Sequence, residues 1–140
     1  LGIWSSEWNR KKFLYGQMYF SHQGVFHHKT LFTQYGMFDE SYCLALDYEL
    51  MFRYLMNNDA IFVPNVIVSA MQSGGMSNTP SNAIKTLREF ARARRKNNVS
   101  QDSIEYYRAV IGAYVKFILV KLLGNKRAAQ CIKFKKFIFR

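Results

Sequence analysis

Asp47 is the carboxylate whose position in this sequence best suits proton chemistry. It stands at the start of a predicted helix that runs to about Asn57–Asn58. The helix is indicated by apolar residues that recur at spacings of three and four, namely Leu50, Met51, Tyr54 and Leu55. A carboxylate there could accept the proton of an attacking hydroxyl group. It could equally serve as a helix cap, which is the commoner role on spacing alone, and the two roles can coexist.

Four further charged residues lie near Asp47 and have mainly structural interpretations. Glu49 and Arg53 are four residues apart on the same helix, the arrangement that favours an ion pair. The alternative, a contact of Glu49 with a bound substrate, is weaker because its spacing puts it on another helix face than Asp47. Asp39 and Glu40 follow Gly36 in a predicted turn, where Asp39 can cap its own backbone and Phe38 can fill the core.

The three histidines do not form a metal-binding pattern. His27 and His28 are adjacent and would point to opposite faces of a strand, so they cannot easily share one ion. His22 and Gln23 could hydrogen-bond to hydroxyl groups of a ligand, although a histidine satisfied within the core is the default. Cys43 and Cys131 form no CxxC pair, which argues against a disulfide scaffold or zinc site and favours a reducing compartment.

The elements that must position these residues are predicted to be a mixture of strands and helices. Short extended segments are expected at 17–20, 24–26, 60–63 and 66–68, the last two separated by a turn at Pro64–Asn65. A short helix at 29–35 should end at Gly36. Ser73–Ser77 has the composition of a flexible loop.

The second half of the chain is predicted to be helical. Ser81 is expected to cap a largely solvated helix that runs through Lys96 and buries Ile84, Leu87, Phe90 and Ala91. A linker at 97–100 separates it from an apolar helix at 104–123 and a basic amphipathic stretch at 128–139.

Length and composition indicate one globular domain. The 140 residues are 49% hydrophobic and 16% aromatic, with two prolines and eight glycines, which excludes disorder and collagen-like repeats. The net charge of +11 is divided unevenly. Residues 1–84 carry five Lys/Arg and six Asp/Glu, whereas residues 85–140 carry fifteen against three. The basic charge therefore belongs to the C-terminal part.

The basic tail has three interpretations. Lysines interleaved with Phe, Ile and Leu suit a helix that lies on an anionic membrane surface. The lysines in question are Lys116, Lys121, Lys133, Lys135 and Lys136. An ordinary helical hairpin is the structural alternative. Nucleic-acid binding through the arginines of 88–96 ranks lower, because no aromatic stacking platform accompanies them. The apolar window 109–123 contains two lysines and is too short to span a membrane.

Four motifs between Ser21 and Ser77 together resemble the C-terminal half of bacterial family-2 glycosyltransferases, the inverting sugar transferases with a GT-A fold. The motifs are SHQGVF with Lys29, YGMFDESY at 35–42, LDYEL with Arg53, and GGMS at 74–77. Each motif is weak alone, and their order and spacing carry the resemblance. It implies an α/β, Rossmann-like GT-A fold represented by its later strands and helices, with a helical C-terminal extension.

The resemblance also implies roles for individual residues. Asp47 would be the general base, and His22, Gln23, Gly74 and Gly75 would contact the acceptor, with the glycine pair in a loop that closes over substrate. The supporting residues would be Asp39, Glu40, Glu49 and Arg53. On this interpretation residues 1–97 are the acceptor-side half of the catalytic domain, and residues 98–140 are the basic tail.

The donor side of such an enzyme is not recognisable here. The family's Asp-x-Asp metal motif is absent, and the one acid-x-acid pair, Asp47–Glu49, takes the place of the base motif. The chain begins with Leu1 and has no secretory signal, so it reads as a piece of a longer protein. We therefore expect Mg²⁺ or Mn²⁺ in the complete enzyme and none in this fragment, which alone should be inactive.

The predicted function is transfer of a sugar, with inversion, from a nucleotide-sugar to a glycan or lipid-linked acceptor. Surface polysaccharide synthesis would be the setting, at the inner face of the cell membrane, with an anionic membrane surface as partner and no nucleic acid. The alternative is a non-catalytic module that binds a membrane surface or nucleic acid through its basic tail.

Overall fold

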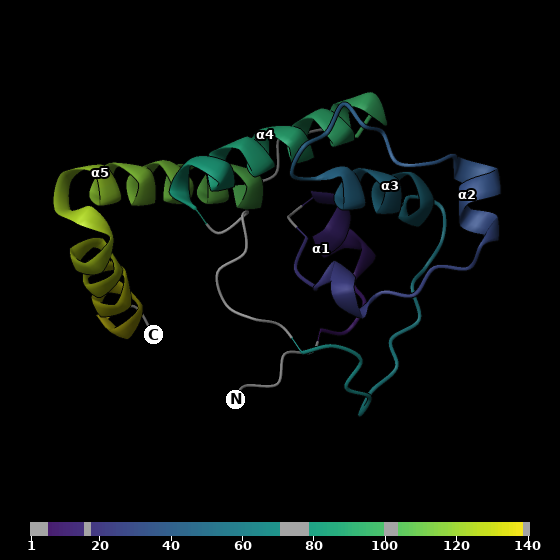
Figure 1. Ribbon diagram of the computed structural model, residues 1–140, viewed down its shortest axis with the longest axis horizontal. Helices are drawn as coiled ribbons and strands as arrows, with labels where there is room; N and C mark the ends of the chain where they lie inside the picture. The colour runs from purple at the N-terminus through teal and green to yellow at the C-terminus, as the bar shows by residue number, and fades with distance from the viewer. Residues whose placement is uncertain (1–5, 16–17, 71–78, 100–103, 139–140) are drawn as a thin grey trace.

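The computed structural model describes residues 6–15, 18–70, 79–99 and 104–138. Along the chain the elements are helical: α1 (Arg10–Tyr15), the 3-10 turn η1 (His22–Gly24), α2 (Thr30–Tyr35), α3 (Leu46–Leu55), α4 (Pro80–Lys96) and α5 (Ile104–Ile138). Figure 1 shows α4 and α5 side by side, with α1, α2 and α3 grouped at one end of this pair. The part of the chain described here is all-helical.

The predicted α/β GT-A fold is therefore wrong for the described residues, which contain no strand and no sheet. Where they are described, the segments expected as strands are extended or irregular, apart from Gly24, which belongs to η1, and none lies in a ladder with another. A strand is stable only when a neighbour satisfies its backbone groups. Residues 61–70 are instead exposed along their whole length. Of the sequence predictions there, the turn at Pro64–Asn65 is confirmed, with Asn65 at φ 62°.

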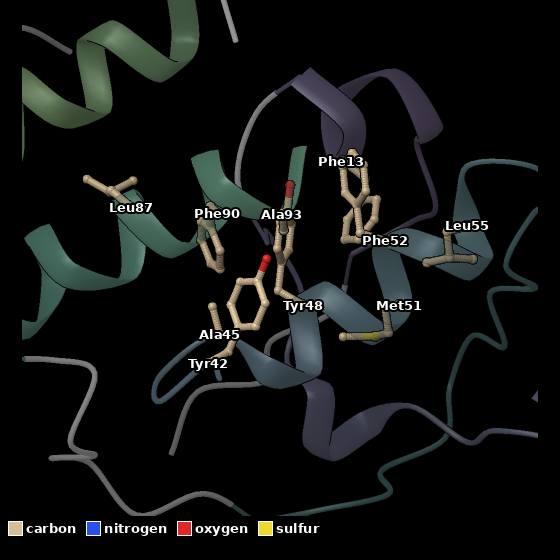
Figure 2. Close-up of a cluster of buried hydrophobic side chains, with 10 residues drawn as sticks. All are labelled: Phe13, Tyr42, Ala45, Tyr48, Met51, Phe52, Leu55, Leu87, Phe90 and Ala93. Carbon is tan, nitrogen blue, oxygen red and sulfur yellow. The ribbon is translucent and has the colours of Figure 1, made fainter. Parts of the chain in front are cut away.

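The helix at 29–35 and the helix that begins at Asp47 are confirmed as α2 and α3. Gly36 ends α2 with φ 81°, a left-handed value that favours glycine. In α3 most side chains are buried, so its apolar residues cover more than one face. The ring of Phe13, from α1, lies 5.2 Å from that of Tyr48 (Figure 2). Tyr48 in turn lies 4.1 Å from Phe90 of α4, so these aromatic rings join three helices.

The start of α4 differs from the prediction. Its cap is Thr79, whose side chain accepts a hydrogen bond from the backbone N–H of Asn82, and Pro80 is the first helical residue. Ser81 is inside the helix and is not the cap. The predicted burial of Leu87, Phe90 and Ala91 is confirmed. The helix is less solvated than predicted near its end, where Ala93 and Arg94 are also buried.

Helices α4 and α5 form an antiparallel hairpin. The Arg88 guanidinium donates to the Tyr114 hydroxyl at 3.0 Å, and the Arg94 guanidinium lies 4.8 Å from the centre of the Tyr106 ring. The earlier residue of α4, Arg88, contacts the later residue of α5, Tyr114, and the later residue of α4 contacts the earlier residue of α5. The two helices therefore run in opposite directions. The predicted helix at 104–123 is confirmed. It continues to Ile138 after a bend at Gly124, which has φ 74° (Figure 1).

Within the described ranges, no helix has both the length and the apolar character needed to cross a membrane.

Candidate functional site

Asp47 is the second residue of α3, next to the open end of the helix. The cap position is occupied by Ala45, which has no side chain that could accept a hydrogen bond. The Oδ1 atom of Asp47 accepts a 2.8 Å hydrogen bond from the backbone N–H of Tyr48. This bond holds one carboxylate oxygen in the first turn and leaves Oδ2 for another partner.

The backbone just before α3 is held by a residue of another helix. The carboxylate of Glu89, on α4, accepts hydrogen bonds from three successive backbone N–H groups, those of Cys43, Leu44 and Ala45, at 3.2, 2.9 and 2.8 Å. A carboxylate bonded to backbone N–H groups at a helix start forms strong, charge-assisted contacts. The sequence analysis did not identify Glu89. The feature that could have pointed to Glu89 is its negative charge, since it is one of three acidic residues in the basic stretch 85–140.

His22 and Asp47 come together at the surface. The His22 Nδ1 atom, on η1, lies 2.9 Å from Asp47 Oδ2, and the two side chains are 55% and 25% exposed. The default interpretation of His22 as a core histidine is therefore wrong. Two of the residues that the resemblance assigned to one site, from segments 25 residues apart in the sequence, are in direct contact.

The remaining residues predicted for acceptor binding are less informative. Gln23 is exposed beside His22 in η1. Gly74 and Gly75, like the whole of the predicted loop at 73–77, lie outside the described residues.

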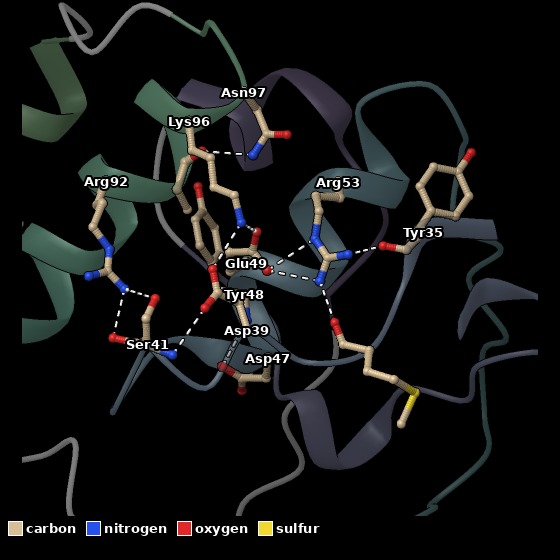
Figure 3. Close-up of polar contacts among 12 residues, drawn as sticks. Tyr35, Asp39, Ser41, Asp47, Tyr48, Glu49, Arg53, Arg92, Lys96 and Asn97 are labelled. Atoms are coloured by element: carbon tan, nitrogen blue, oxygen red, sulfur yellow. Dashed lines mark hydrogen bonds and ion pairs between the residues drawn. The ribbon is translucent and has the colours of Figure 1, made fainter. Parts of the chain in front are cut away.

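Glu49 faces the interior, on the side of α3 away from Asp47 (Figure 3). Its fully buried carboxylate forms ion pairs with Arg53 at 3.0 Å and with the Lys96 ammonium of α4 at 2.9 Å. The predicted pair with Arg53 is confirmed, and the alternative of a contact with substrate is wrong because Glu49 is inaccessible. Arg53 also donates to the carbonyl oxygens of Tyr35 and Met37, which ties the end of α2 to α3.

Asp39 extends this network on the far side of Lys96 (Figure 3). One carboxylate oxygen accepts from the Ser41 N–H at 3.0 Å and the other from Lys96 at 2.9 Å. Hydrogen bonds from the Ser41 side chain, from Lys96 and from the Ser41 backbone hold the pKa of Asp39 well below its ordinary value. The bonds with Asp39 and Glu49 raise the pKa of Lys96. The prediction that Asp39 caps its own turn is confirmed.

Two neighbours of Asp39 in the sequence do not join the network. Glu40, predicted as a supporting residue, is exposed. Phe38 is also exposed, and its ring lies 6.0 Å from that of Phe32, so the prediction that it fills the core is wrong.

The other candidate ligands are dispersed. The His28 Nδ1 atom lies 2.9 Å from the Thr30 hydroxyl, and burial lowers the pKa of His27. Among the side chains described, no three of the His, Cys, Asp and Glu type gather as a metal site would require. These residues therefore do not fit the divalent ion that the resemblance implies for a complete enzyme.

The tail lysines are described only in part. Lys116 and Lys121 are exposed on α5. The side chains of Lys133, Lys135 and Lys136 lie outside the described part of the structure, although their backbone belongs to α5.

Comparison of the chain with protein-family models, with curated proteins and with solved structures finds no match. The functional argument therefore depends on the geometry around Asp47.

Proposed function

We propose that this chain carries the acceptor side of an inverting glycosyl transfer, with Asp47 as the general base. The observation that supports this best is the contact between His22 and Asp47 at the exposed start of α3. The proposal depends on this site and not on the GT-A fold, since the described residues form no such fold.

The proposed step moves one proton and exchanges one bond. An acceptor hydroxyl oxygen attacks the anomeric carbon of the donor sugar from the face opposite the nucleoside diphosphate. The new C–O bond forms as the bond to the phosphate oxygen breaks, and the diphosphate leaves with that electron pair. Asp47 takes the hydroxyl proton as the oxygen attacks, which removes the positive charge that would develop there. His22, bonded to Oδ2, orients the carboxylate and is exposed to solvent.

The packing around Asp47 suits a group that must be held in one geometry. Glu89 fixes the backbone just before α3. Glu49, with its two cationic partners, fixes the opposite face of the first turn to α4. A backbone that is fixed by such contacts keeps a catalytic side chain in its productive orientation and lowers the entropic cost of the reaction. This support explains why a buried ion network lies two residues from a carboxylate that is one-quarter exposed.

The donor would be a nucleotide-sugar held by another part of the complete protein. This chain has no Asp-x-Asp motif and no described cluster of metal-ligating side chains. A divalent ion bound elsewhere would neutralise the diphosphate charge. We therefore expect residues 1–140 alone to bind no nucleotide diphosphate in a Mn²⁺-dependent manner. Calorimetry of the purified chain with and without Mn²⁺ tests this, and metal-dependent binding would contradict our division of the enzyme.

The decisive experiment is Asp47→Asn in the complete protein, with release of nucleoside diphosphate as the readout. The amide retains the size of the carboxylate but cannot accept the proton, so kcat should fall at least about a hundredfold. Binding of the nucleotide-sugar should change little. Asp59→Asn is the matched control, because Asp59 is an exposed carboxylate bonded to Trp8 and Arg10. If Asp47→Asn keeps most of its kcat, Asp47 is not the base.

His22→Gln separates the two members of the pair. A glutamine amide can still donate to Asp47 but cannot carry a proton. If Asp47 is the base, this variant should keep a substantial part of kcat. If His22 itself takes the proton, with Asp47 as the group that orients it, His22→Gln should be as inactive as Asp47→Asn.

A further inference from the structure

The side of α5 that faces away from α4 is apolar and exposed. Six residues that follow one another at spacings of three and four form it: Ile104, Tyr107, Ile111, Val115, Ile118 and Leu122. This spacing places them on one side of a helix. We call these six residues the outer stripe. It covers the helix from 104 to 122, a length of about 27 Å.

The outer stripe is not the surface by which the hairpin folds. Ala109, Val110 and Ala113 lie on the opposite side of α5 and are partly buried against the core. Ile111, Ile118 and Leu122 are 63%, 51% and 75% exposed. An ordinary helical hairpin accounts for the inner side of α5 and leaves the outer stripe unexplained. A continuous exposed apolar surface of this kind marks an interaction site.

Positive charge borders the outer stripe on both sides. At about 100° per residue, Arg108 falls about 60° to one side of its centre and Lys121 about 80° to the other, and both are exposed. The sequence of α5 contains eight Lys/Arg and a single acidic residue, Glu105. The one carboxylate of α4, that of Glu89, is bonded to the backbone ahead of α3. The surface beside the stripe is therefore cationic.

We propose that the outer stripe docks this chain on the surface of an anionic lipid bilayer. The helix would lie in the plane of the interface, with its aliphatic side chains among the upper acyl chains and Tyr107 at the level of the headgroups. Arg108 and Lys121 reach the lipid phosphates from the two edges. Lys116, which the sequence analysis grouped with Lys121, is about 140° from the centre of the stripe and belongs to another surface.

Charge complementarity selects this partner over two others. A second copy of the chain would bring Arg108 and Lys121 next to identical cations, and like charges along a helix interface disfavour pairing. A nucleic acid would match the cations but would leave the apolar side chains between them in water. An anionic bilayer satisfies both parts of the surface. The proposal uses no residue of the Asp47 site, so the two can fail independently.

The experiment measures flotation of the 140-residue chain with vesicles of phosphatidylcholine alone or mixed with phosphatidylglycerol. The chain should bind the anionic vesicles and be partly released by high salt, which screens the headgroup charge. Ile111→Ser with Ile118→Ser should weaken binding at least about tenfold, because two inserted side chains are lost. Both positions are exposed, so the thermal melt should be unchanged.

Val66→Ser with Ile67→Ser is the matched control. These residues are 58% and 79% exposed, but they lie in the extended segment away from α5. Loss of binding in this control equal to the loss in the stripe variant would overturn the proposal.

A second variant tests the charges without touching the apolar side chains. Arg108→Glu with Lys121→Glu should weaken binding to anionic vesicles about tenfold or more and remove most of the salt dependence. Lys11→Glu with Lys29→Glu, at exposed positions in the N-terminal part, should change binding much less. The proposal is overturned if the native chain does not float. It is also overturned if the apolar double variant (Ile111→Ser with Ile118→Ser) and the charge double variant (Arg108→Glu with Lys121→Glu) both float normally. A dimer of the native chain, seen by ultracentrifugation and abolished by the apolar double variant, would overturn it as well.

Discussion

Helices α3 and α5 are both rich in apolar residues, yet the structure uses them in opposite ways. Most side chains of α3 are buried, including the charged Glu49, because α1 and α4 pack against it and α2 is tied to it by Arg53. Helix α5 packs on α4 with one side and exposes large aliphatic residues on the other. The comparison shows that an apolar helix surface must be covered, whether by the protein itself or by a partner. Which of the two covers it depends on the elements that pack beside the helix. Four substitutions test how far this contrast extends.

The largest effect should come from the aromatic centre of α3. Phe52 is fully buried, and its ring lies 5.4 Å from Tyr48 and 5.9 Å from Phe13. Phe52→Ala should lower the free energy of unfolding by about 3–5 kcal/mol, because it leaves a cavity among rigid rings. Ile118→Ala, on the outer stripe, should change it by less than about 0.5 kcal/mol. Urea denaturation followed by circular dichroism measures both, and equal losses would remove the contrast between the two helices.

The buried charge of α3 should have the next largest effect. Glu49→Gln leaves the Lys96 and Arg53 cations beside a neutral amide, and removal of one member of a buried ion network costs about 3 kcal/mol. Chemical denaturation measures the loss. Glu40→Gln provides the control at an exposed acid nearby and should be neutral. A Glu49→Gln protein as stable as the native chain would show that the network adds nothing to the packing of α3 on α4.

A smaller effect is expected from Glu89, which joins α4 to the start of α3. In Glu89→Gln the amide nitrogen would face a backbone N–H, since the carboxylate now accepts from three of them. The loss should be about 1–2 kcal/mol. In this variant, hydrogen exchange of the backbone amides at 43–45 should become faster, whereas the exchange rates at 50–52 should change much less. An equal increase in the exchange rates of all α3 amides would mean that Glu89 supports the whole helix and not only its start.

The smallest effect is expected for the contribution of Asp39 to stability at low pH. Hydrogen bonds from Ser41 and Lys96 lower the pKa of Asp39 in the folded chain, so the ionised group favours the folded state. Its contribution is present above about pH 4, the ordinary pKa of the unfolded chain, and is lost as the pH falls towards the lower folded pKa. Asp39→Asn should flatten the fall of melting temperature below pH 4. An unchanged acid slope would show that Asp39 contributes nothing to stability through its charge.

The sequence predicted α2 and α3 because their signals are local, but it did not predict α1. Gly36 ended α2 as expected, and the apolar spacing after Asp47 located α3. The strands were wrong because a β-branched run such as Val66–Val68 indicates only a backbone suited to a sheet, and pairing depends on a neighbour elsewhere in the chain. Figure 1 shows that segment as an extended connection between α3 and α4.

The site was predicted in part. The contact of His22 with Asp47 agrees with the resemblance that grouped them, whereas spacing alone favoured Asp47 as a cap. Glu89 was missed because its partners are backbone N–H groups 44–46 residues away, and backbone donors leave no trace in residue identity.

The long sequence separation between Glu89 and the start of α3 also orders events while the chain is being made. Translation completes α3 at Leu55, but the carboxylate that holds the backbone before it is added only 34 residues later. At about 5–20 residues per second, roughly 2–7 seconds pass before Glu89 has been added. Until then the amides of Cys43, Leu44 and Ala45 lack the carboxylate that they bind in the folded chain. The geometry around Asp47 can therefore be completed only after Glu89 has been made and α4 packs against α3.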